Sequence, residues 1–142
     1  MIDINDETLV REAIELLYFG YREFTAGPDR ILEQRGLNRV HHRILYFVGR
    51  NEAISVSALL DLLAVSKQAL NAPLRQLVTM ELISNAPAPG DRRVKQLRLT
   101  ADGRKLERRL TGTQVKQLSA VFDAAGRDAA QGWRQVMLRM QV

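Results

Sequence analysis

The chain has 142 residues, a formal net charge of +5, no cysteine, and two histidines that are adjacent, His41 and His42. This length is enough for one domain with a real core. The lack of cysteine excludes disulfides, thiolate metal sites and a cysteine nucleophile. Neighbouring histidines cannot share one helix face, which argues against a histidine-only metal site. With no apolar run near the ~20 residues of a membrane span and an acidic start unlike a signal peptide, we expect a cytoplasmic protein without a cofactor.

Positive charge is concentrated in one part of the chain. Residues 66–110 carry ten basic and four acidic side chains, a net charge of +6, whereas residues 1–65 have a net charge of −3. Such asymmetry is typical of a surface that binds a polyanion. The alternative is a solvated basic face, the commoner outcome for a random basic stretch.

The first predicted element is a long helix. Apolar side chains recur at roughly helical spacing over residues 6–35, with charged residues between them. Gly27-Pro28 lies inside this stretch, so we expect a kink or a break there. Gly36 suits the C-terminus of the helix, where a left-handed residue is common.

Three further helices are predicted, each with a polar residue that can cap it: Asn38, Ser55 and Ser66. The last of them runs to about Glu81. Its apolar side is formed by Leu70, Leu74, Leu77 and Val78. Its other side carries Lys67, Gln68, Asn71, Arg75 and Gln76. Two helices joined by a short turn, the second with polar and basic side chains outward, form a helix-turn-helix.

One residue disturbs this recognition helix. Pro73 lies inside it and removes one backbone hydrogen bond. We therefore expect the helix to bend near Ala69 to Asn71.

A basic hairpin is predicted next. Residues 83–86 and 96–99 read as strands, and the loop between them contains Pro87, Pro89 and Gly90, which we expect to interrupt the ladder. The same loop is expected to carry Asp91, Arg92, Arg93 and Lys95. A hairpin directly after a recognition helix is a wing.

Two helices are predicted to close the chain. Thr100 can cap the first, which ends at Gly126, and the second covers about residues 128–140. Terminal helices that lie too far from the winged lobe to pack on it need another partner. We expect the following residues to form a homodimer interface rather than a monomer core: Leu9, Leu16, Trp133, Met137 and Met140.

The order of these elements, together with three local motifs, resembles the MarR family of transcriptional regulators. The motifs are Ser66-Lys67-Gln68 at the start of the recognition helix, Asp91-Arg92-Arg93, and Leu99-Thr100-Ala101-Asp102-Gly103. The last two are similar to the wing signature of the family, an Asp-x-Arg tip followed by Leu-Thr-x-x-Gly. The resemblance implies a winged-helix homodimer that binds pseudo-palindromic operators and is often modulated by a small ligand. Without cysteine, the thiol-sensing branch of the family is excluded.

The fold class expected is therefore mainly α with a small β-wing. Residues 37–100 would form a winged helix-turn-helix lobe that binds DNA, and residues 1–36 and 101–142 would form dimerisation helices of the same single domain.

Roles for the recognition helix follow from side-chain chemistry. Gln68 and Asn71 carry amides that can pair with adenine in the major groove, and a solvated face or a phosphate contact is the alternative. Lys67 and Arg75 are expected to contact phosphates. Ser66 is expected to cap the helix, with a phosphate contact as a further role.

The wing tip is assigned to Arg93, which would enter the minor groove, where an arginine senses a narrow A·T-rich shape. Arg92 is the alternative for this role. Asp91 is expected to hold the arginine or the backbone turn. Lys95 is expected to contact the DNA backbone or to remain solvated.

A possible effector cleft involves His41, His42, Tyr18 and Tyr21. The functional reading is ligand contact or pH sensing. The structural reading is that one histidine is hydrogen-bonded between helices, the other is exposed, and the tyrosines are core residues.

The function predicted is sequence-specific DNA binding by a homodimeric regulator, with repression expected and activation left open. The alternative is a winged-helix module that binds another protein and has lost operator binding, for which Pro73 is the best argument. An enzyme has no residue set behind it, because no catalytic constellation or phosphate-binding glycine loop is present in the sequence.

Overall fold

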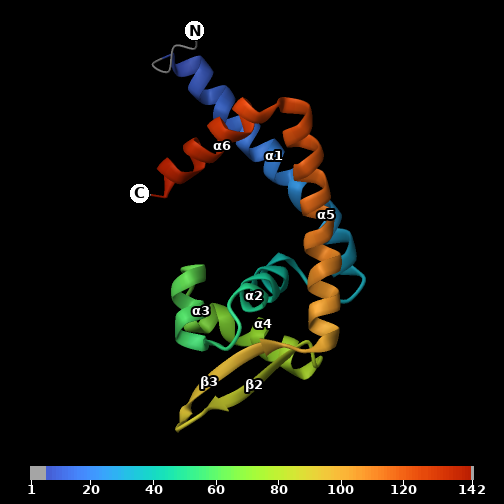
Figure 1. Ribbon diagram of the computed structural model, residues 1–142, viewed down its shortest axis with the longest axis vertical. Helices are drawn as coiled ribbons and strands as arrows, with labels where there is room; N and C mark the ends of the chain where they lie inside the picture. The colour runs from blue at the N-terminus through green and yellow to red at the C-terminus, as the bar shows by residue number, and fades with distance from the viewer. Residues whose placement is uncertain (1–5, 142) are drawn as a thin grey trace.

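A computed structural model describes residues 6–141 of the chain. It consists of six helices and a small antiparallel sheet among these residues, drawn in Figure 1. In chain order the elements are α1 (Glu7–Glu33), α2 (Arg39–Arg50), β1 (Ile54–Ser55), α3 (Val56–Leu63), α4 (Lys67–Thr79), β2 (Ile83–Ala88), β3 (Asp91–Leu99), α5 (Ala101–Ala125) and α6 (Arg127–Met140). The mainly α fold with a β-wing is as expected.

The winged lobe contains α2, α3, α4 and the sheet, whose strand order is β1-β3-β2. Its core is built from leucine, isoleucine and valine side chains that converge from every one of these elements. The core also includes Leu32 from the end of α1 and Leu106 and Leu110 from the start of α5. It therefore extends beyond residues 37–100 on both sides.

The predicted helix caps are confirmed. The Asn38 side chain accepts a hydrogen bond from the Val40 N–H, Ser55 from Ala58, Ser66 from Ala69, and Thr100 from Gly103. Each satisfies a backbone donor that the first turn of a helix leaves without a partner. The start of each of these helices is thus specified locally by the sequence.

The expected break at Gly27-Pro28 is wrong, because α1 continues through Pro28, which is buried, whereas a kink there stays a prediction. The recognition helix α4 also continues through Pro73, and the bend near Ala69 to Asn71 stays a prediction. It ends at Thr79, earlier than the predicted Glu81. Glu81 takes a left-handed conformation with φ of 60°, and the Leu82 N–H donates to the Leu77 carbonyl, which closes the helix end.

The wing is longer than predicted. β2 extends to Ala88 and β3 begins at Asp91, so the connection is reduced to Pro89 and Gly90. Pro87, expected to end the ladder, pairs with Lys95 instead. It is tolerated because β2 is an edge strand, where a residue without an N–H loses little.

The turn from wing to α5 explains the last glycine of the Leu-Thr-x-x-Gly motif. Thr100 donates its N–H to the Leu82 carbonyl and its hydroxyl to the Glu81 carbonyl, at 3.1 and 2.6 Å. This brings the first turn of α5 onto the chain at Leu82. A Cβ at position 103 would overlap the Leu82 carbonyl oxygen, so only glycine fits there.

The remaining helical segments form a helical arm, which we define as residues 7–23 of α1, residues 112–125 of α5, and α6. In Figure 1 the arm extends away from the winged lobe along α5. None of the residues of α6 is buried, and the only buried residues of α1 are Thr25, Pro28 and Leu32. None of the helices among residues 6–141 combines the length and apolar character that a membrane span requires.

Candidate nucleic-acid interface

The outward face of α4 carries the side chains predicted to meet DNA. Gln68, Asn71 and Arg75 lie at helical positions i, i+3 and i+7, so they share one face, and Lys67 borders it. All four are exposed, while Leu70, Leu74 and Leu77 bury the opposite face. Within residues 6–141 neither Lys67 nor Arg75 takes part in an ion pair, so the positive charge of both is available to a polyanion.

The start of α4 has its own anion-binding character. Ser66 uses its hydroxyl oxygen to cap the helix at 3.1 Å from the Ala69 nitrogen, as expected. The hydroxyl proton stays available to a phosphate oxygen. The positive end of the helix dipole and Lys67 act in the same place and in the same direction.

The wing tip bulges away from the ladder at its arginines. The register passes from Pro87–Lys95 to Ala88–Asp91, so Arg92, Arg93 and Val94 have no residue opposite them. Asp91 accepts the Arg93 N–H at 3.0 Å and lies 3.3 Å from the Arg93 Nε, as predicted for its structural role. The Arg93 side chain is 92% exposed. Arg92 and Lys95 are also exposed.

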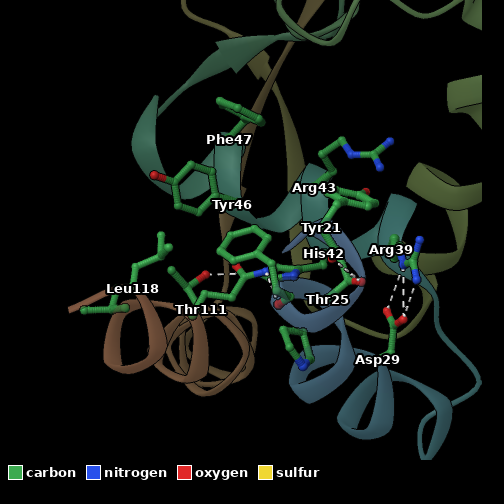
Figure 2. A pocket seen from close by; sticks show the side chains of 14 residues that line it. Tyr21, Thr25, Asp29, Arg39, His42, Arg43, Tyr46, Phe47, Thr111 and Leu118 are labelled. Atoms are coloured by element: carbon green, nitrogen blue, oxygen red, sulfur yellow. Dashed lines mark hydrogen bonds and ion pairs between the residues drawn. The ribbon is translucent and has the colours of Figure 1, made fainter. Parts of the chain in front are cut away.

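A cavity of about 400 Å³ lies between α1, α2 and α5. Its walls are mostly apolar and aromatic, with a few polar groups (Figure 2). They are formed by Tyr21, Phe24, Thr25, Pro28, Asp29, Arg39, His42, Arg43, Tyr46, Phe47, Thr111, Gln114, Val115 and Leu118. A cavity of this size and chemistry suits a small, mostly apolar molecule.

Two of the four residues predicted for an effector cleft line this cavity, Tyr21 and His42. The other two, Tyr18 and His41, are not among its lining residues. Tyr18 is exposed on α1 and packs edge-on against Phe19. The structural alternative for the histidines is half wrong: neither is exposed, because α2 packs one into each of two interfaces.

His42 is held inside the lobe by Thr111, with 3.1 Å between Nε2 and Oγ1 (Figure 2). Burial lowers the pKa of His42, the neighbouring Arg43 acts in the same direction, and Glu107 and Asp29 oppose it. The imidazole is therefore neutral at the cavity wall.

An ion pair closes another side of the cavity. Arg39 and Asp29 meet in a two-pronged contact, with Nε and Nη2 of the arginine 3.1 and 2.9 Å from Asp29 Oδ2. The hydrogen bond to Asp29 raises the pKa of Arg39, and the guanidinium also lies over the Tyr21 ring. This pair joins the end of α1 to the start of α2.

Sequence reasoning missed most of the cavity wall. Asp29 and Arg39 are ten residues apart and sit on different helices, and His42 and Thr111 are 69 residues apart. Neither pair leaves a local pattern in the chain. The exposed positions of the recognition helix, in contrast, follow directly from helical periodicity.

Comparisons with known proteins agree with this geometry. A family model described as MarR family matches residues 35–94. The chain is 41% identical over 140 residues to the HTH-type transcriptional regulator PetP of Rhodobacter capsulatus, an alignment covering 99% of this chain and 84% of that protein.

Solved structures share the fold at lower identity. Streptococcus pneumoniae FabT, in a complex with DNA, aligns with a TM-score of 0.82 at 16% identity, over 93% of this chain and 94% of its own. Staphylococcus aureus MarR, in a complex with salicylate and kanamycin, aligns with a TM-score of 0.76 at 22% identity, over 95% and 91%. The winged lobe, the family match and the relative at 41% identity together show that this chain is a helix-turn-helix transcriptional regulator of the MarR family.

Proposed function

We propose that the protein is a homodimeric repressor that binds a pseudo-palindromic operator and is modulated by a small ligand. Each protomer inserts α4 into a major groove and the wing into the adjoining minor groove. The observation that carries this proposal is the outward face of α4, where exposed amides lie beside the exposed cations Lys67 and Arg75, followed by two exposed arginines at the wing bulge. A repressor of this kind acts by blocking polymerase.

The roles of single residues follow from their positions. Gln68 and Asn71 read base edges. Lys67, Arg75 and Ser66 hold phosphates and set the orientation of the helix. Arg93 enters the minor groove, with Arg92 and Lys95 beside it. That FabT was solved in a complex with DNA supports this use of the fold.

The helical arm supports the dimer. Ile14, Leu16, Tyr18 and Met140 are each more than 60% exposed in the single chain. Leucine and isoleucine side chains left in water forgo ~1.5–3 kcal/mol each relative to burial. A second copy related by a two-fold axis would bury the same residues on both protomers, so a single interface would cover both exposed surfaces.

The cavity supports ligand modulation. Its aromatic walls would pack against an apolar ring, and Arg43, the neutral His42 and Thr111 offer polar contacts. It lies where α1 and α5, which lead to the arm, meet α2 of the lobe. A molecule bound there would change the angle between the two winged lobes of a dimer. Staphylococcus aureus MarR, of similar fold, was solved with salicylate.

The alternative is a winged-helix module that binds a protein and not an operator. This alternative rests on Pro73 disturbing the recognition helix, but α4 runs unbroken through that residue. A protein-binding wing also has no need of exposed arginines at its tip. We therefore favour DNA.

The test is to select bound fragments from genomic DNA with the purified protein and to measure affinity for the enriched site at several salt concentrations. We expect enrichment of a two-fold symmetric site at moderate salt. Lys67→Ala should weaken binding to all sequences alike and reduce the salt slope by about one per protomer. Equal binding to all fragments at moderate salt would support the protein-binding alternative instead.

A further inference from the structure

Helix α2 separates the cavity from the recognition helix, and its two histidines face different neighbours. His42 lines the cavity and meets Thr111 of α5. His41 points to α4, where its Nε2 lies 2.9 Å from the Oε1 of Gln76. His41 is only 4% exposed, and it is not among the residues that line the cavity.

The hydrogen bonds of His41 and Gln76 form one consistent network. The His41 Nδ1 accepts the backbone N–H of Asn38 at 3.0 Å, so the ring carries its proton on Nε2. That proton is donated to the Gln76 Oε1. The Gln76 amide nitrogen in turn donates to the Gly36 carbonyl at 3.3 Å. Every group has a partner, and only one tautomer and one amide orientation satisfy all three bonds.

This network is a directional contact between α4 and the α1–α2 junction. Leu70, Leu74, Leu77 and the partly buried Val78 also pack α4 against the lobe core, but this apolar burial is non-directional. Apolar packing holds the helix in the lobe but resists small rotation and sliding less than a hydrogen-bonded bridge does. Gln76 directly follows Arg75 in the chain, but its side chain turns toward His41 and Gly36, so a change in this bridge would rotate the face of α4 that carries Gln68, Asn71 and Arg75.

We propose that His41 and Gln76 are positioning residues that fix the rotation of the recognition helix and thereby set sequence discrimination. The proposal rests on the operator binding proposed above. Neither side chain contacts DNA in this account. They act through Gln68 and Asn71, whose paired contacts to a base edge tolerate little displacement.

The experiment compares Kd for the operator enriched from genomic DNA with Kd for a scrambled duplex of the same length. Gln76→Met removes both hydrogen bonds at similar volume. His41→Gln keeps an acceptor at the third helical position for the Asn38 N–H, as in a standard capping box, but removes the imidazole bridge. The variant with both substitutions completes a double-mutant cycle, which measures the coupling between the two residues. The matched control is Gln117→Met, which removes a side-chain bond to the Glu23 carbonyl in the helical arm.

We expect each single variant to lower the ratio of the two affinities about five- to tenfold, the loss typical of one misplaced base contact. The double variant should lose no more than either single variant, because both break the same bridge. Gln117→Met should keep the wild-type ratio. Thermal midpoints of all variants are measured in parallel, because a merely structural role would lower the midpoint and the bound fraction but leave the ratio unchanged.

The proposal is overturned if Gln76→Met and His41→Gln keep the wild-type ratio within about twofold, or if their losses add in the double variant. The proposed function fails separately, and this inference with it, if the wild-type protein binds the operator and the scrambled duplex equally.

Discussion

The winged lobe and the helical arm of this protein differ in how far they bury their apolar side chains within the single chain. Among residues 6–141, the fifteen buried hydrophobic residues all lie from Leu32 to Leu110, in the lobe and the helix ends that join it. The arm is as rich in apolar side chains, yet α6 buries none of its residues. The lobe therefore has a core within the single chain, whereas the arm presents an exposed apolar surface. In the proposed function, a second copy of the chain covers this surface, and the association of the two arms sets the spacing of the two lobes on DNA.

A charge placed on the arm should disrupt association most strongly. Leu16 is 62% exposed in the single chain, and we expect Leu16→Glu to weaken the dimer by about two orders of magnitude or more. Burial of a leucine is worth ~1.5–3 kcal/mol, and the symmetric interface counts it twice. Sedimentation velocity measures the result.

Leu62→Glu is the matched control, because Leu62 lies on α3 of the lobe and is 48% exposed. It should leave the oligomeric state unchanged. A Leu16→Glu protein that remains dimeric at the wild-type concentration would place the dimer interface elsewhere.

Two glycines of α5, one packed against the lobe and one in the arm, should respond to alanine in opposite directions. Gly103→Ala should destabilise the protein by about 3 kcal/mol, because the new methyl group overlaps the Leu82 carbonyl oxygen of the packed lobe. Gly112 has no atom within 4 Å of an added Cβ. Gly112→Ala should therefore stabilise by ~0.5–1 kcal/mol through helix propensity. Chemical denaturation measures both, and similar losses for the two variants would contradict the packing described at the start of α5.

The wing provides a third test, on binding. Arg93→Ala should weaken operator binding by ~1–3 kcal/mol, mostly at flanking A·T positions. Lys116→Ala removes the same charge from an exposed position of the arm and should have little effect. A gel-shift titration in which the two variants bind alike would contradict the assignment of Arg93 to the minor groove.

The smallest expected effect is a pH dependence at the junction of the two regions. Burial lowers the pKa of His42, so the unfolded chain takes up more protons than the folded one below about pH 6.5. This contribution to the free energy of unfolding is complete above that pH and declines as the pH falls. Urea midpoints measured between about pH 7.5 and 5.5 should decrease less for His42→Asn than for the wild type. Parallel curves for both proteins would show that His42 does not carry the dependence.

What the sequence predicts well here is local. Asn38, Ser55, Ser66 and Thr100 mark helix starts because a cap acts within three residues of itself. The DNA-facing side of α4 follows from periodicity, and the role of Asp91 follows from its distance of two residues from Arg93.

What the sequence does not predict depends on partners distant in the chain. The sequence alone predicts a short wing, because Pro87 is tolerated in the ladder only where β2 is an edge strand. The cavity combines three helices, and its polar groups pair across ten to 69 residues. From the sequence, Gln76 is one more polar residue of α4, whereas in the structure its amide bonds to His41 and Gly36.

In the proposed function, two winged lobes are joined by the arm on one operator. The decisive measurement is the mass of the complex on a duplex with a single selected site, combined with a footprint of that duplex. Two protomers should bind each duplex and protect two half-sites about one helical turn, ~34 Å, apart. One protomer bound stably to each duplex, or a footprint of a single half-site, would contradict it.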